Sequence, residues 1–386
     1  MTLTQTAATF RQVVKIGSLL LVVLILFRTG YVVYGMFYPT SQPSTPSPTA
    51  TLLFGNLPQL EVKPRTISLP ANFSVQLDLY RASLPASPGI ANVYPILKAP
   101  YGFLSEDRAK ELARTFGLSN EPIKLSTTEN VWSRPNTTLK VNIQSLNFHY
   151  EYNYGADTRV FANSSFSGKP QVEDITTSML TKHTMLSGFG DDLSQGIKSI
   201  SFLSYKSGQL APVSKLEEAT AARVDIMREP VSYTVDNLNV TIPFVSPSYV
   251  GSLTYVIVVN TKLEKNNTFP QAIEISNTHW KFQQDLASTY PIITSQSAWE
   301  EFQVSPQSYV VYVGNSKLGP EDFVGGTPEI QTFITRDSYL AYLDPEDESD
   351  FIQPVWVFTG EATLTSGGML DWAAYVPAID PAHLKP

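Results

Sequence analysis

Ser145–Tyr154, SLNFHYEYNY, is the stretch that decides the fold. Apolar and polar side chains alternate along its whole length, with Leu146, Phe148, Tyr150, Tyr152 and Tyr154 against Ser145, Asn147, His149, Glu151 and Asn153. A strict period of two predicts a β-strand with one buried face and one solvated face. The flanking runs Val131–Pro135 and Leu139–Ile143 are predicted to be its antiparallel neighbours.

Helices are predicted at only three places. Ser105–Phe116 begins with a serine suited to capping, and its apolar residues recur at helical spacing. Val172–Leu186 and the Ser295-capped Ser295–Phe302 are the other two. The remaining strand predictions are Ser74–Tyr80, Ile197–Tyr205, Gln209–Val213, Ala222–Met227, Val231–Val235, Leu253–Asn260, Ile273–Phe282, Tyr309–Val313, Glu329–Leu343, Pro354–Thr363 and Leu370–Pro377. This pattern predicts an α+β fold with antiparallel sheets, because a parallel doubly wound sheet needs a crossover helix for each strand.

The strand-rich body is long enough for two domains. About 330 residues remain after the N-terminal segments are set aside, and typical domains hold about 100–200 residues. We predict a first α+β domain over 57–220 and a second, more strand-rich α+β domain over 221–386. A weak repeat supports two related halves, because Tyr94-Pro95-Ile96 and Tyr290-Pro291-Ile292 each precede a predicted helix.

The segment Ile16–Tyr38 is predicted to be a transmembrane helix. It holds a single charged residue, Arg28, and crossing a bilayer takes about 20 mostly apolar residues. Arg11 and Lys15 precede it, and no Lys or Arg follows it before Lys63. The positive-inside rule therefore places residues 1–15 in the cytoplasm and the remainder outside the membrane. A cleaved signal peptide is the alternative, but the sequence after the apolar run offers no small-x-small cleavage site, which favours an uncleaved signal-anchor.

A linker over residues 39–56 is predicted between this helix and the body. Its first part, Pro39–Thr49, contains only Pro, Ser, Thr and Gln. Such a composition cannot bury a core and favours extended polyproline geometry, at about 3.1 Å per residue. The linker is therefore expected to hold the body away from the lipid headgroups.

Composition excludes several classes of function. The net charge of −8 and the pI of about 5.1 argue against a nucleic-acid partner. The absence of cysteine excludes disulfides, thiolate metal sites and a cysteine nucleophile. A large outside-facing region without disulfides fits a bacterial or archaeal envelope better than a eukaryotic secretory route.

No group of residues in the sequence identifies a reaction. His149, His183, His279 and His383 lack metal-ligand spacing, and no Gly-x-Ser-x-Gly motif is present. The acidic run Asp344–Asp350 lacks the glycine and closing glutamate of an EF-hand loop, so we interpret it as a solvated connection between strands. We therefore predict no catalytic residues, no metal site and no cofactor, and a non-enzymatic protein whose ectodomain binds a protein partner or a ligand.

Two other functions stay open at this point. An envelope hydrolase would need a site assembled from residues far apart in the sequence. A glycan-binding or cell-wall-binding protein would expose some of the 44 Phe, Tyr and Trp residues in a row on one sheet face. Most of these aromatic residues are expected to be core, since one face of each sheet must be buried.

Short stretches of the body resemble a known group of proteins. Leu104–Gly117, Tyr290–Phe302 and Phe351–Ile379, together with the order of anchor, helices and antiparallel strands, resemble the PepSY-type and YycH/YycI-type extracytoplasmic proteins of bacteria. The resemblance implies a non-catalytic protein. It also implies regulation of a membrane sensor kinase or a protease through the membrane segment and the ectodomain.

Arg28 is the candidate contact with a partner inside the membrane. A charge at mid-bilayer costs about 2.5–3.5 kcal/mol, which a partner in the membrane would offset; a guanidinium that snorkels to the headgroups is the alternative. Arg28→Leu should therefore insert more easily while co-purifying less of its membrane partner, as measured by crosslinking in membranes. Unchanged crosslinking would leave Arg28 as a snorkelling residue in contact with lipid alone.

Overall fold

The computed structural model describes residues 49–235, 238–261, 269–320 and 326–386. The described residues belong to one compact unit, Pro48–Pro386. The predicted cytoplasmic tail (1–15), the predicted transmembrane helix (16–38) and residues 39–48 of the linker lie outside the described residues. Within the described residues, no helix has the length and apolar character needed to cross a membrane.

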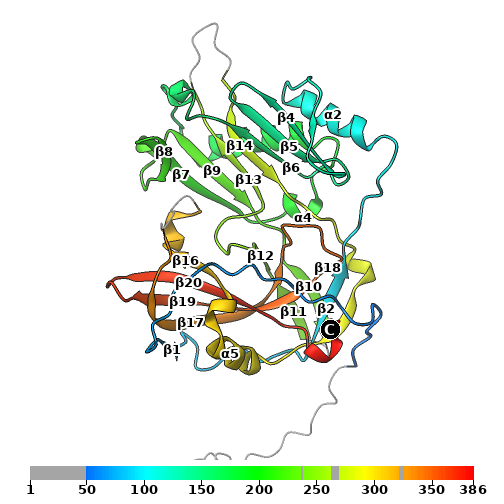
Figure 1. Cartoon of the computed structure of the whole chain (residues 1–386), viewed down its shortest axis with the longest axis vertical. Helices are drawn as coiled ribbons and strands as arrows, with labels where there is room; N and C mark the ends of the chain where they lie inside the picture. Colours follow the sequence, from blue (N-terminus) through cyan, green and yellow to red (C-terminus); the bar gives the residue numbers. More distant parts are fainter. Residues whose placement is uncertain (1–48, 236–237, 262–268, 321–325) are drawn as a thin grey trace, which may run out of the picture. The chain divides into compact units, whose positions relative to one another are not determined.

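The body has the predicted α+β class, with many strands and few helices. A nine-stranded sheet is antiparallel at every pairing (Figure 1). Its strands, in spatial order, are β3 (Ile123–Lys124), β4 (Glu129–Arg134), β5 (Thr137–Asn142), β6 (Phe148–Tyr152), β14 (Ala272–Asn277), β13 (Thr254–Val258), β9 (Ala221–Ile226), β7 (Lys198–Lys206) and β8 (Gln209–Pro212).

Strand β6 confirms the centre of the alternating stretch. Phe148, Tyr150 and Tyr152 are buried, whereas His149 and Glu151 face the other side of the sheet. Its neighbours are β5, as predicted, and β14, while β4 lies one strand further out. The strand is shorter than predicted, by two residues at its end and by three at its start. There the Asn142 side chain accepts hydrogen bonds from the backbone N–H groups of Gln144 and Ser145, which closes a turn.

Helices α2 (Ser105–Thr115) and α3 (Lys169–His183) pack together with the nine-stranded sheet in one hydrophobic core. Residue Leu104 occupies the N-cap position of α2, and Ser105 is its first residue, so the predicted serine cap is displaced by one position. The imidazole of His183 stacks on the Phe116 ring, with ring centroids 3.7 Å apart, and its Nδ1 lies 2.8 Å from the Thr115 hydroxyl. The last turns of the two helices are therefore joined through a buried histidine.

A six-stranded sheet is the second large sheet of the body. It is made of β1 (Ser74–Leu77), β17 (Ile330–Leu343), β19 (Pro354–Leu364), β20 (Met369–Pro377), β16 (Val310–Gly314) and β12 (Phe244–Val245). Strands β1 and β12 pair in parallel with β17, and the other pairings are antiparallel. Helix α5 (Ser295–Val304) packs on this sheet, where Phe302 stacks on Trp372 with ring centroids 5.1 Å apart. Its N-cap is Thr294 rather than Ser295, because the Thr294 hydroxyl accepts the hydrogen bond from Ser297 N–H.

Two small sheets and several short helices complete the body. Strands β15 (Ser288–Pro291), β2 (Ile90–Pro95) and β18 (Phe351–Ile352) form one sheet, and β10 (Val231–Val235) and β11 (Leu238–Ile242) form the other. The two Tyr-Pro-Ile segments thus belong to neighbouring antiparallel strands, β2 and β15. The short helices are α4 (Asp191–Ser194) and the 3₁₀ turns Thr158–Phe161, Leu216–Glu218, Gln284–Leu286, Pro306–Ser308, Ser316–Leu318 and Pro381–His383.

The nine-stranded sheet crosses the domain boundary predicted between residues 220 and 221. Strands β9, β13 and β14 follow residue 220 yet pair with strands that precede it. The six-stranded sheet likewise takes β1 from near the start of the body, and its core includes Leu57, Ala91 and Val93. Residues far apart in sequence therefore share each core, and a consecutive division of the body does not follow the sheets.

His183 should make the free energy of unfolding depend on pH. Burial, reinforced by Lys182, lowers the pKa of His183 to about 3, whereas an unfolded chain takes up this proton near pH 6.5. The unfolded state binds more protons between these values, so stability falls as the pH drops from 6.5 toward 3, by up to about 1.4 kcal/mol per pH unit. In urea titrations, the stability advantage of the wild type over His183→Gln should shrink by about 2–3 kcal/mol between pH 7 and pH 4.5. An advantage that stays constant with pH would contradict this assignment.

Candidate functional site

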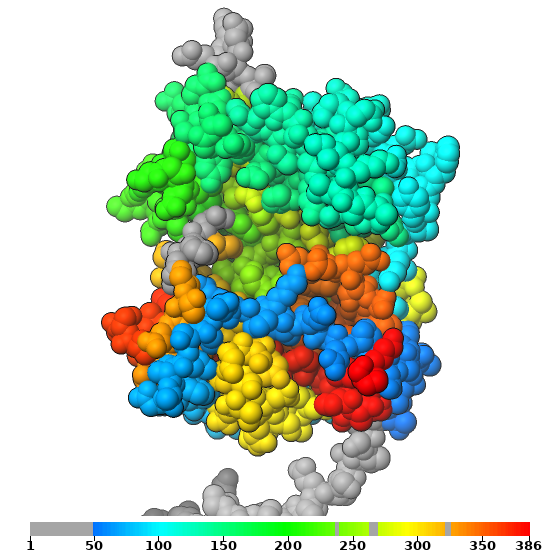
Figure 2. Space-filling view, viewed as in Figure 1, coloured from blue at the N-terminus to red at the C-terminus, as the bar shows by residue number. Residues whose placement is uncertain are grey.

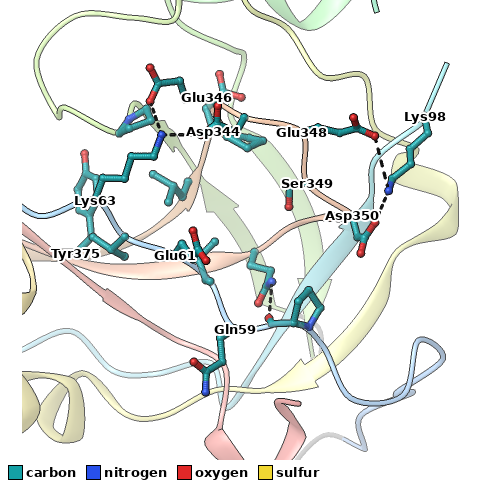
Figure 3. Close-up of a pocket in the computed structure, with 18 residues that line it drawn as sticks. Gln59, Glu61, Lys63, Lys98, Asp344, Glu346, Glu348, Ser349, Asp350 and Tyr375 are labelled. Carbon is teal, nitrogen blue, oxygen red and sulfur yellow. Dashed lines mark hydrogen bonds and ion pairs between the residues drawn. The ribbon is translucent and has the colours of Figure 1, made fainter. Parts of the chain in front are cut away.

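The candidate site is a groove of about 500 Å³ between two stretches of chain that are far apart in sequence. One wall is the extended segment 58–63, and the other is the acidic loop 344–350, which follows β17 (Figure 3). Lys98, Pro247, Leu343, Gln353 and Tyr375 complete the lining. The blue surface of the first wall and the orange surface of the acidic loop lie on the same face of the body (Figure 2).

Backbone hydrogen bonds fix both walls. Leu57 donates its N–H to the His383 carbonyl and accepts from Lys385 N–H, at 2.9 and 2.7 Å, which attaches the start of segment 58–63 to the C-terminal chain. The side chain of Gln353 then donates to the Pro58 carbonyl at 3.1 Å. The acidic loop begins with a 2.9 Å bond from Asp344 N–H to the Val245 carbonyl and ends in β18. The groove is therefore built from firmly attached backbone.

Two lysines neutralise part of the acidic loop. Lys63 Nζ lies 3.0 Å from Glu346 and 2.6 Å from Asp347, and Lys98 Nζ lies 2.6 Å from Asp350. Hydrogen bonds to Asp347 and Asp350 raise the pKa of Lys63 and of Lys98, respectively. These side chains are at least half exposed, so each pair contributes only about 0–1 kcal/mol. With Glu61, Asp344 and Glu348, the lining holds six carboxylates against two ammonium groups.

Below the groove, Asp344 enters a buried charge network centred on Arg228. The Arg228 side chain has no exposed surface, and its Nη2 lies 2.9 Å from Asp344 Oδ1 and donates to the Trp280 carbonyl at 2.8 Å. Its Nη1 donates to Asp192 Oδ2 at 3.2 Å. Burial raises the pKa of the Asp344 carboxyl, and Arg228 opposes that rise.

His279 holds the other side of this network. Its Nε2 lies 3.0 Å from Asp192 Oδ1, and because an ionised carboxylate only accepts, Nε2 carries the donated proton. Burial alone would raise the pKa of Asp192, but the hydrogen bond from His279 and the charge of Arg228 lower it. The network thus joins α4 to the chain after β9, β14 and β17.

Two glycines allow α4 to approach this network. A Cβ at Gly190 would collide with the His279 ring and the Asp192 carboxylate. A Cβ at Gly196 would overlap the carbonyl oxygen of Met227, beside Arg228. The pair brackets α4, so the position of Asp192 against Arg228 depends on the absence of side chains at both sites.

The acidic loop also borders a second hollow of about 570 Å³. Glu346, Asp347 and Glu348 line this hollow as well as the groove. Its other lining comes from the polar face of the nine-stranded sheet and includes His149 and Tyr255. Trp280 Nε1 donates to the Glu346 carbonyl at 3.4 Å. The acidic loop therefore separates the groove from the second hollow, and three of its carboxylates line both.

The hydroxyl–imidazole pair of Thr115 and His183 lacks the arrangement of an activated nucleophile. The Thr115 hydroxyl donates to the Leu112 carbonyl at 2.7 Å, so its contact with His183 Nδ1 is an accepted hydrogen bond. The imidazole cannot take that proton as a general base while this bond persists. Across the described ranges, no group of three or more His, Asp or Glu side chains is arranged to hold a metal ion.

The structure brings together residues that the sequence treated separately. The acidic run Asp344–Asp350 does connect two strands, as predicted, but Asp344 is buried and paired rather than solvated. Arg228, Lys63 and Lys98 were not predicted as part of a site, and nothing in their local sequence marks them. Arg28, the predicted intramembrane contact, lies outside the described residues. The most exposed aromatic side chains, Phe103, Tyr80 and Tyr101, occur in irregular segments and not in a row on a sheet.

No family model and no curated protein match the chain. Nine chains of solved structures match it, and among them is an uncharacterized protein from Eubacterium rectale ATCC 33656. The two share 10% sequence identity over 82% of this chain and 92% of that one, with a TM-score of 0.35. A likeness at this level carries no argument about fold or function.

Proposed function

We propose that this chain is a non-enzymatic, single-pass envelope protein whose ectodomain binds a protein partner at the groove between segment 58–63 and the acidic loop. The observation that carries the proposal is the lining itself, in which five carboxylates, besides the Asp344 that pairs with Arg228, outnumber two lysines around a cavity of about 500 Å³. Apolar side chains such as Leu60, Val62 and Pro247 lie among these charges. An extended segment with basic and apolar residues is the ligand that this combination fits.

Replacing the lysines of the groove by basic groups of a partner would cost little free energy. A basic partner would compete with Lys63 and Lys98 for the same carboxylates, replacing exposed ion pairs that contribute about 0–1 kcal/mol each. The released lysines would become hydrated again, and the partner would displace water from the apolar side chains of the lining. Excess negative charge would also steer a basic segment toward the groove at low ionic strength.

The order of segments connects the groove to the membrane. The predicted anchor precedes segment 58–63 in the sequence. The end of the predicted linker, residues 49–56, packs on the body, where Leu52 N–H donates to the Thr289 carbonyl at 3.2 Å, and segment 58–63 follows it. A partner resident in the same membrane is therefore the partner that we propose, with Arg28 as a second contact inside the bilayer. The resemblance to PepSY-type and YycH/YycI-type proteins extends the proposal to regulation of a membrane sensor or protease.

Charge reversal in the groove should abolish partner crosslinking. A photo-crosslinking amino acid at Gln59 of the full-length chain in native membranes should give adducts that weaken at least about tenfold in Glu346→Lys/Asp347→Lys, because repulsion replaces attraction. Adducts should also decrease as the ionic strength rises. The matched control is Glu173→Lys/Asp174→Lys on the exposed side of α3, which should leave them unchanged. Equal adduct yields in both charge-reversed chains would contradict the proposed site.

A further inference from the structure

A separate cleft of about 700 Å³ lies where the C-terminal ends of α2 and α3 approach the nine-stranded sheet. It shares no lining residue with the acidic groove. Arg114 and Thr115 line it from α2, Lys182 and His183 from α3, and Arg134 from the end of β4. The cleft therefore gathers cationic side chains from three elements, in a chain whose net charge is −8.

The cationic groups exceed the anionic ones in this cleft. Its lining contains Arg114, Arg134 and Lys182, and a single carboxylate, Asp157. Arg159 forms two 2.7 Å hydrogen bonds with that carboxylate and thereby lowers the pKa of Asp157. Asp157 is thus already neutralised by a residue outside the lining, and the positive charge of the cleft is not cancelled by it.

The cations keep donors free for a ligand. Lys182 makes no hydrogen bond or ion pair with any residue in the described ranges. Arg134 donates from Nη1 to the Gly117 carbonyl at 3.2 Å, one bond from a group that carries five donors. Arg114 pairs with Glu111 at 2.7 Å on the exposed side of α2. Arg134 and Lys182 are therefore the two groups best placed to receive an anion.

The rest of the lining is uncharged and includes apolar side chains. Met179 and Phe269, which are only partly buried, contribute apolar surface beside the cations. His183 adds no charge near neutral pH, because burial and Lys182 lower its pKa to about 3. Tyr150 is buried, and that burial raises the pKa of its phenol, so it too is neutral. An inorganic anion would use the cations and leave this apolar surface unfilled.

We propose that the cleft binds an organic carboxylate, with its carboxyl group held by Arg134 and Lys182 and its apolar body packed against Met179 and Phe269. A guanidinium matches a carboxylate through two parallel N–H···O bonds, and the ammonium adds a charge-assisted bond. Binding here is independent of the acidic groove and of the partner proposed for it.

Isothermal titration calorimetry with the full-length chain in lipid nanodiscs tests this site, with phenylacetate as the probe. Phenylacetate should bind saturably, while phenylacetamide, its neutral analogue, should bind at least about tenfold more weakly, because it lacks the charge. Arg134→Gln and Lys182→Gln should each weaken phenylacetate about tenfold. The matched control Lys169→Gln, at the other end of α3, should leave the affinity unchanged.

Two further arms of the titration separate this site from simple charge attraction. The affinity should stay constant from pH 6 to pH 8, since His183, whose pKa is lowered to about 3, stays uncharged across that range. Inorganic phosphate should bind more weakly than phenylacetate. Phosphate binding as tightly as phenylacetate, equal losses in Lys169→Gln and Lys182→Gln, or equal binding of phenylacetamide would each overturn the proposal.

Discussion

The buried guanidinium of Arg228, placed between Asp192 and Asp344, is the interaction on which the rest of the structure depends. Its side chain has no exposed surface, so removing its charge from water is costly and must be offset by close partners. Two carboxylates and the Trp280 carbonyl supply them, and the Phe244 ring lies 5.4 Å from the guanidinium carbon. Because these groups follow strands of both large sheets, the network fixes one sheet's connections against those of the other.

The network around Arg228 sets the geometry of the acidic groove. Asp344 is both the first residue of the acidic loop and a partner of Arg228, so the loop leaves β17 in a direction set by a buried contact. The acidic side chains that follow are exposed, and lysine pairs of modest strength hold them. A rigid base with an adaptable rim is the arrangement that suits recognition of a flexible segment, because the rim can exchange partners while the base keeps its position.

Local pattern predicted the elements well and their assembly poorly. The alternation around Tyr150, the helix spacing after Ser105 and the closely spaced strand runs Ile197–Tyr205 and Gln209–Val213 each depend on neighbouring residues, and β6, α2 and the β7–β8 hairpin formed there. Pairings such as β6 with β14 join residues more than 100 positions apart, and no local signal encodes them. The candidate site could not be predicted from the sequence for the same reason. Lys63 and Arg228 are far from the acidic loop in sequence, and only the fold places them beside it.

A double-mutant cycle on Arg228 and Asp344 tests this account most directly. The free energy of unfolding, from urea titration of the full-length chain, should fall by about 3–5 kcal/mol in Arg228→Met, which leaves buried carboxylates unpaired. The double variant Arg228→Met/Asp344→Leu should lose at least about 1 kcal/mol less than the sum of the single variants, since each residue mainly stabilises the other. Additive losses, or a loss below about 1 kcal/mol in Arg228→Met, would contradict the central role of this contact.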